Sequence, residues 1–111
     1  MELRKRFGGI EDWSGYDEAR HFEWHRQLHI FEIPFYYIEY GIAQMGALQV
    51  WQRSRKDKTQ ALRDYRKALA LGGSKKLPEL FEAAGIQFDM SEKTLGPLID
   101  KVKRELDMSA E

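Results

Sequence analysis

Three histidines stand at a spacing that allows metal binding. His21, His25 and His29 are four residues apart, so in a helix each adjacent pair faces the same way, about 6 Å apart along the axis. His21 and His29 would then lie about 12 Å apart, too far to share one ion. A free-standing metal-binding helical protein that uses His25 with His21 or His29 is one hypothesis. The interpretation we adopt is a solvated or half-buried histidine face with no metal site.

The string HFEWH, residues 21 to 25, resembles a scrambled HExxH zinc motif. In HExxH the glutamate directly follows the first histidine and lies beside the metal. Glu23 stands two residues after His21, so on a helix it projects about 200° away from both histidines. Glu23 therefore cannot be the general base for an ion that this pair would hold.

Tyrosines are concentrated after Pro34. Tyr36 and Tyr40 are four residues apart, and Tyr37 and Tyr40 are three apart, so at least two phenols can project from one side of a helix. A phenol stays protonated near neutral pH and can donate a hydrogen bond to a developing oxyanion, a contact worth about 10² to 10³ in rate. Packing of the rings is the alternative interpretation.

The sequence around these tyrosines resembles a known family. Residues 29–44 (HIFEIPFYYIEYGIAQ) are similar to a segment near the C-terminal end of the zinc oligopeptidases of the thimet oligopeptidase and oligoendopeptidase F family. The similarity continues through the closing helices of oligoendopeptidase F-type enzymes and covers nearly the whole chain. The other similar stretches are residues 24–29 (WHRQLH), 46–51 (GALQVW), 65–75 (YRKALALGGSK) and 77–85 (LPELFEAAG).

This resemblance implies a largely helical, two-lobed enzyme with a deep channel that admits short peptides. It implies a zinc ion held by the two histidines of HExxH and a downstream glutamate. A histidine and tyrosines of the C-terminal helices would lie across the channel from the zinc. The histidine corresponds to His29. Tyr37 and Tyr40 keep the family's spacing and would contact the substrate and the oxyanion, with Tyr36 as the alternate to Tyr37.

The sequence departs from the family in one respect, because no HExxH occurs in its 111 residues. It therefore resembles the C-terminal part of such an enzyme, either a fragment or a truncated relative. We expect zinc in the complete enzyme, no cofactor in this chain alone, and no activity from this chain alone. The expected partners are short peptides and the zinc-bearing remainder of the peptidase.

The elements that would position these residues are all helices. Apolar spacing predicts about five of them in a single all-α domain, residues 1–111, with no strand. An entry loop at residues 7–15 would precede a helix over residues 16–32, capped by Ser14 or Asp17. Pro34 should stop or kink the helical pattern, which would resume over residues 35–55.

Three further helices are marked by their ends. Asp57 followed by Gln60 predicts the start of the third helix, and Gly72-Gly73 its stop. Pro78 would lie in the first turn of a short helix that ends at Gly85. Asp89 or Ser91 would open the last helix, in which one buried face is expected. That face contains Leu95, Leu98, Ile99, Val102 and Leu106.

The predicted helix at residues 35–55 is apolar on nearly all sides. Only Glu39, Gln44 and Gln49 interrupt it before Trp51, so it needs partners on several sides. We expect a larger body around it, or a homodimer. A second hypothesis for function follows, a non-catalytic assembly module that dimerises or docks onto a separate zinc-bearing chain. A membrane span is not expected, because the apolar run is short and Glu39 near its middle would cost about 2 kcal/mol or more.

The composition excludes several other classes. Eighteen basic residues balance eighteen acidic ones, so no long-range field favours nucleic acid or an anionic membrane. The absence of cysteine excludes a disulfide framework, a thiolate nucleophile and a cysteine-containing zinc site. The opening residues MELRKRFGG lack the apolar segment of a secretion signal, so a cytoplasmic protein is expected.

Overall fold

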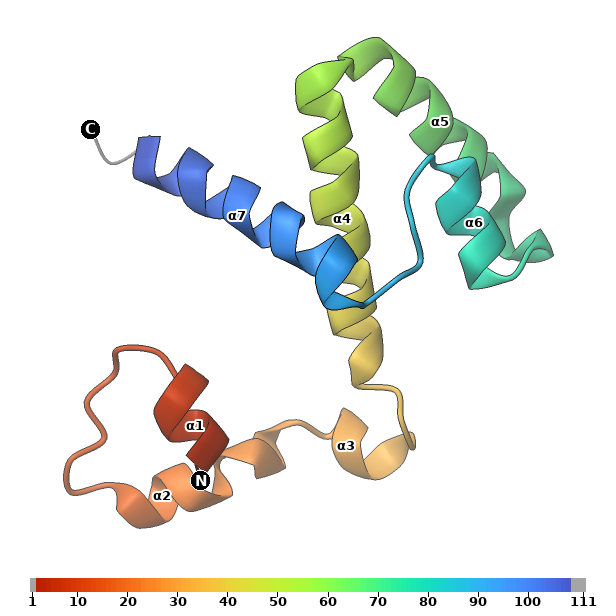
Figure 1. The fold of residues 1–111 in the computed structure, drawn as a ribbon. Coiled ribbons are helices and arrows are strands. Elements are labelled where there is room, and N and C mark those ends of the chain that lie inside the picture. Colours follow the sequence, from red (N-terminus) through yellow and green to blue (C-terminus); the bar gives the residue numbers. More distant parts are fainter. Residues whose placement is uncertain (1, 109–111) are drawn as a thin grey trace. The chain divides into compact units, whose positions relative to one another are not determined.

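A computed structural model describes residues 2–108 of the chain (Figure 1). Helices and their connections account for all of these residues, and no strand occurs among them, so the prediction of an all-α fold is confirmed. The elements are α1 (Glu2–Phe7), α2 (Asp17–Phe22), the 3-10 helix η1 (Glu23–Arg26), α3 (His29–Glu32), α4 (Ile38–Lys56), α5 (Lys58–Leu71), the 3-10 helix η2 (Gly72–Ser74), α6 (Leu77–Ala83) and α7 (Glu92–Met108).

The chain divides into two compact units at the start of α4. The first unit runs to Tyr37 and the second begins at Ile38. The first contains short helices of four to six residues, whereas α4, α5 and α7 in the second have 19, 14 and 17 residues. A single domain over the whole chain stays a prediction.

The helix predicted over residues 16–32 is not continuous, and that prediction is wrong. The α-helix ends at Phe22, a 3-10 turn follows, and Gln27 has a non-helical ψ of 79°. No side chain of α2, η1 or α3 is buried, and a short helix without a packed face is marginal. The expected cap is also absent, because Tyr16 occupies the N-cap position without a side-chain hydrogen bond. Helix α1 was not predicted.

The interruption expected at Pro34 is confirmed, and it extends further than predicted. Residues 33–37 form a bend and turn, and α4 begins at Ile38 rather than near Phe35. The N–H of Tyr36 donates to the carbonyl of Ile33 at 3.3 Å. Phe35 has a φ of +63°, which is outside the helical region, so the helix cannot form across it.

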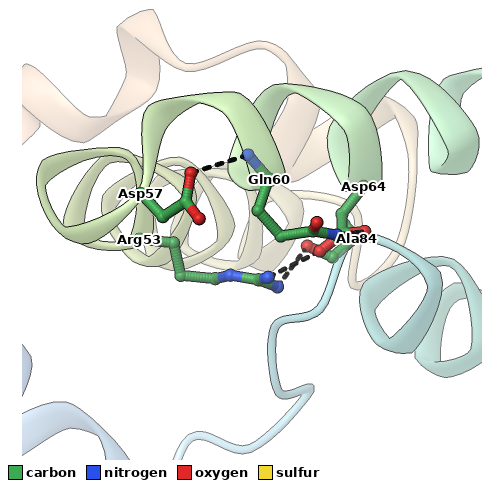
Figure 2. A network of polar contacts seen from close by, with 5 residues as sticks. All are labelled: Arg53, Asp57, Gln60, Asp64 and Ala84. Carbon is green, nitrogen blue, oxygen red and sulfur yellow. Dashed lines mark hydrogen bonds and ion pairs between the residues drawn. The ribbon is translucent and has the colours of Figure 1, made fainter.

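From the start of α5 to the end of α6 the predicted helix ends are confirmed. The Asp57 carboxylate accepts a hydrogen bond from the N–H of Gln60 at 2.9 Å and caps α5 (Figure 2). Helix α5 stops at Gly72, whose φ is +52°. Pro78 lies in the first turn of α6, and the chain leaves that helix through Gly85 at a φ of +70°.

The core of the second unit lies where α4, α6 and the segment after α6 meet. It consists of buried Met45, Phe81, Ala84 and Ile86. The Phe81 ring fits against Gly46, where an added Cβ would approach the ring to 3.0 Å. Absence of a side chain at Gly46 therefore leaves room for the Phe81 ring of α6 against α4.

A polar network joins α4, α5 and the end of α6. The Arg53 guanidinium donates to the Ala84 carbonyl at 2.9 Å and to the Asp64 carboxylate at 2.6 Å (Figure 2). The Gln60 amide donates to the same carboxylate at 2.8 Å. A Cβ on Gly85 would fall 1.3 Å from an Arg53 nitrogen, so any other residue would displace the guanidinium from this network, and the φ of +70° also favours glycine.

A second pair of hydrogen bonds holds the segment that connects α6 to α7. The Gln49 side-chain amide donates to the carbonyl of Gln87 and accepts from the N–H of Gln87, both at 2.9 Å. One side chain of α4 thus satisfies both backbone groups of Gln87. The connection is tied to α4 without any regular secondary structure of its own.

Helix α7 crosses α4 (Figure 1), and its predicted apolar face is only partly covered. Leu98 is buried, and Leu95 and Val102 are half-buried. Ile99 and Leu106 stay 47% and 65% exposed, because α7 lies against only one neighbouring helix. In the part of the chain that the structure describes, no helix is both long and apolar enough to cross a membrane.

Candidate functional site

The imidazole of His29 lies beside two tyrosine rings. His29 is the first residue of α3 and is half-buried. Its ring and that of Tyr36 are stacked, with centroids 5.9 Å apart and planes 20° apart. The ring of Tyr37 is tilted by 48° at a centroid distance of 6.2 Å. Three of the four residues singled out from the sequence are thus brought together in the first unit.

The turn at Pro34 produces this arrangement. Pro34 occupies the second position of the four-residue turn from Ile33 to Tyr36, and Phe35 occupies the third with positive φ. Proline at the second position and positive φ at the third are the features of a type II turn, in which glycine usually takes the third position. A phenylalanine there costs about 1 to 2 kcal/mol. The strained turn folds the chain back, so that Tyr36 and Tyr37 meet His29.

Tyr40 is placed differently from the prediction. The spacing suggested that at least two of Tyr36, Tyr37 and Tyr40 project from one side of a helix, but α4 begins only at Ile38, so Tyr36 and Tyr37 have no helical register with Tyr40. Tyr40 lies in the first turn of α4, within the second unit, and is 47% exposed. Tyr36 and Tyr37 belong to the turn instead.

His21 and His25 also lose the helical register on which their pairing depended. His21 is in α2, and His25 is in the 3-10 turn that follows. The ring of His25 is packed among aromatic rings: its centroid is 4.2 Å from Trp24, 5.3 Å from Phe22 and 5.9 Å from Phe31. Trp24 and Phe31 are themselves stacked at 5.3 Å. Sequence reasoning missed this aromatic cluster, for which the alternation of rings and histidines from Phe22 to Phe31 was the available signal.

The residues present do not fit a zinc site. Within residues 2–108 there is no group of three or more histidine, aspartate or glutamate side chains that could hold a metal ion. A catalytic zinc needs three such protein ligands, and the sequence has no HExxH to supply two of them. No reaction step through a metal can therefore be assigned to these side chains.

The His29, Tyr36 and Tyr37 cluster can still contribute polar contacts. Each phenol can donate and accept one hydrogen bond, and a neutral imidazole has one donor and one acceptor nitrogen. These are groups that bind a peptide backbone or a developing oxyanion, and they do not by themselves supply a nucleophile or an activated water.

Comparison with known proteins gives one match. A family model described as peptidase family M3 matches residues 1–96, a range that includes His29, Tyr36, Tyr37 and Tyr40. No curated protein and no solved structure matches the chain.

Proposed function

The chain belongs to peptidase family M3, and on this premise we propose that it is the substrate-binding, C-terminal part of a zinc-dependent oligoendopeptidase. In this role His29, Tyr37 and Tyr40 contact short peptides and the oxyanion that forms when the peptide bond is attacked. The observation that carries the proposal is the family match over the segment that contains these residues. The reaction is proposed to occur in the cytoplasm.

The geometry supports different roles for the two neighbouring tyrosines. Tyr36 is half-buried and nearly parallel to the imidazole, which favours a role in holding the His29 ring in place. Tyr37 is 43% exposed and tilted against the same ring, so it is the more exposed of the two phenols. We therefore assign the hydrogen bond to the substrate to Tyr37 and the support of His29 to Tyr36.

Tyr40 is the proposed donor to the oxyanion. A rigid helix holds a side chain more precisely than a loop does, and Tyr40 is in the first turn of the long helix α4. A preorganised donor of this kind contributes about 10² to 10³ to the rate. Zinc, where the family binds it, supplies Lewis-acid polarisation and an activated water, and its ligands would have to lie outside the present sequence.

A chimeric enzyme tests the role of Tyr40. Residues 1–96 would replace the matching segment of an active oligoendopeptidase of the family, and hydrolysis of an internally quenched peptide would be followed. The substitution Tyr40→Phe removes only the hydroxyl, so kcat is expected to fall by about 10² to 10³. The zinc content, measured by atomic absorption, should not change.

Tyr65→Phe is the matched control, because Tyr65 lies on α5 with 42% exposure and outside the proposed site. This chimera should retain its kcat. Equal turnover of the Tyr40→Phe and Tyr65→Phe chimeras would contradict the role of Tyr40. Hydrolysis of the same peptide by the 111-residue chain alone, with zinc added, would contradict the wider proposal that the catalytic ion is held elsewhere.

A further inference from the structure

An open apolar groove runs along the second unit, between α4, α5 and α6. Its volume is about 650 Å³. Gly46 and Phe81 lie at its base, Ala47 and Trp51 line the side formed by α4, and Leu69 and Leu77 line the sides formed by α5 and α6. Leu69 is 60% exposed and Leu77 is 42% exposed, so these side chains face solvent rather than a covering element.

The chemistry of the groove does not favour a small polar ligand. Pockets for such ligands contain a few convergent polar groups that fix the orientation of the ligand. Ser54 and Tyr65 are the polar side chains among the lining residues, and the Ser54 hydroxyl already donates to the Trp51 carbonyl at 2.7 Å. The groove therefore offers apolar contact area with little polar recognition.

The form of the groove favours a helix as its occupant. No sheet edge exists among residues 2–108, so a partner cannot add a strand. On α4, the lining residues at positions 43, 46 and 47 are small, and small side chains let another helix approach closely. An amphipathic helix that lays its apolar face into a hydrophobic groove is a common mode of peptide recognition.

The segment that contains α5 is strongly positive although the whole chain is neutral, whereas α6 on the other side of the groove carries Glu79 and Glu82. Residues 53–76 contain nine of the eighteen basic residues and two of the eighteen acidic ones, a net charge of +7. Arg53 pairs with Asp64, and Lys75 lies 3.6 Å from Glu79. Arg63 and Arg66 are exposed on α5 and have no ion pair within residues 2–108.

Arg66 adjoins the apolar surface, whereas Arg63 lies further round α5, about 120° from Leu69. Together with Leu62 they line a shallow hollow on α5. Leu62 is 50% exposed and lies seven residues, about two helical turns, before Leu69 of the groove. Arg66 is four residues from Leu62 and three from Leu69, so all three share one side of the helix.

We propose that the groove between α4, α5 and α6 binds an amphipathic helix whose apolar face enters the groove and whose acidic flank lies along α5 beside Arg66. The apolar side chains provide contact area. Arg66, which has no ion pair within residues 2–108, selects for negative charge and orients the partner, and Arg63 adds positive charge further round the helix. This binding role is independent of the proposed contacts to peptide substrates.

Two labelled helical peptides test the proposal on the full 111-residue chain. Both have about 18 residues, long enough to form helix, and the same leucine face, but one carries glutamates on its flank and the other lysines. Fluorescence anisotropy should show about tenfold tighter binding of the glutamate peptide in about 50 mM salt. The preference should diminish in about 500 mM salt, where exposed ion pairs are screened.

Three variants separate the contributions of charge on α5 and of apolar contact in the groove to peptide binding. Arg63→Glu with Arg66→Glu should reverse the preference between the peptides, whereas Lys93→Glu with Lys103→Glu, an equal change of charge on α7, should preserve it. Ala47→Lys adds a positive charge but fills the groove. It should therefore weaken binding of the glutamate peptide about tenfold or more, although charge alone would strengthen it. Circular dichroism would establish that each variant retains the helix content of the parent.

Three results would overturn the proposal. One is equal affinity for the two peptides, and another is a glutamate peptide that binds Ala47→Lys more tightly than the parent chain. The third is a measured mass of two chains that Ala47→Lys returns to one, since the groove would then be occupied by a second copy.

Discussion

The two units of this chain use their aromatic and aliphatic side chains in different ways. Before Ile38, none of the described side chains is buried, and the rings of Trp24, His25, Phe31 and their neighbours contact one another near the surface. After Ile38, Phe81 and Met45 are less than one-tenth exposed and belong to one buried cluster, in which the Phe81 ring packs against Gly46 of α4. The first unit stacks rings locally, whereas the second builds a core from distant segments.

The comparison shows what determines helix length in this protein. Helix α2 has six residues and buries none of them, while α4 has 19 and buries Met45 and Gly46. Most helical stability in proteins comes from packing one face rather than from intrinsic propensity. Aromatic rings that pack on rings close to them in the sequence, as around His25, do not form a helix face that is buried against another helix.

The largest expected effect is the loss of the core ring in the second unit. Phe81→Ala should lower the free energy of unfolding by about 3 to 5 kcal/mol, because it removes a buried ring and leaves a cavity beside Gly46. Phe31→Ala in the first unit is the control: its ring is 57% exposed, and a loss below about 1 kcal/mol is expected. Urea unfolding followed by circular dichroism measures both. Equal losses of unfolding free energy in the two variants would show that the two units do not differ in how much their aromatic rings stabilise the fold.

The next effect concerns the glycine beside Arg53. Gly85→Ala should destabilise the second unit by about 2 kcal/mol or more, because alanine disfavours positive φ and its Cβ would displace the Arg53 guanidinium from Ala84 and Asp64. Gly73→Ala should change stability by less than about 0.5 kcal/mol, since a Cβ there meets no atom within 4 Å. Thermal unfolding of both variants is the measurement. A larger effect at Gly73 would contradict the role assigned to Arg53.

A smaller effect is expected from the side-chain amide that holds Gln87. Gln49→Ala removes two hydrogen bonds and should cost about 1 kcal/mol. The Gln87 amide should also exchange faster with deuterium in this variant. Gln44→Ala on the exposed side of the same helix should leave that exchange rate unchanged, and acceleration in both variants would indicate general loosening of α4.

The smallest effect is a pH dependence that distinguishes two similar turns. The Thr94 hydroxyl, and then the N–H and hydroxyl of Ser91, donate to Asp89 and hold its pKa below the ordinary value of 3.8. In the first unit the hydroxyl and N–H of Ser14 likewise lower the pKa of Asp12. A carboxylate with a lowered pKa in the folded state stabilises the fold above about pH 4, and this contribution is lost as the pH falls through the folded-state pKa.

Only one of these turns leads directly into a long helix. The Ser91 carbonyl accepts the first hydrogen bonds of α7, so helix content should fall as the pH drops below about 4 in the parent and less steeply in Asp89→Asn. Asp12→Asn should titrate like the parent, because no helix begins at Ser14. Far-ultraviolet circular dichroism follows both. The same response in the two variants would show that the turn at Asp89 does not support α7.

Helix ends in the second unit could be predicted because their causes are local. The capping of Gln60 by Asp57, the stop at Gly72 and the proline in the first turn of α6 each depend on a few neighbouring residues. The same holds for the break at Pro34. The continuous helix over residues 16–32 was predicted wrongly, because the pattern does not reveal that its apolar face finds nothing to pack on.

The candidate site was predictable in part. Residue types and the family resemblance pointed to His29 and the tyrosines, and their catalytic and binding roles stay predictions. The helical register expected between Tyr40 and Tyr36 or Tyr37 is absent because φ at Phe35 is positive and α4 begins at Ile38. Phenylalanine rarely adopts such a φ, and no sequence pattern indicates it. The Arg53 network and the groove were also missed, since each joins residues from helices that are far apart in the sequence.

By itself the sequence determined the helical class, most helix ends after Pro34, the family and the absence of an HExxH motif, because each depends on residue types at short spacing. The tertiary structure alone decided which apolar residues are buried, where the chain divides and how His29 meets Tyr36 and Tyr37. These features depend on contacts among segments distant along the chain and on one strained turn, and their energies appear only when the segments are brought together.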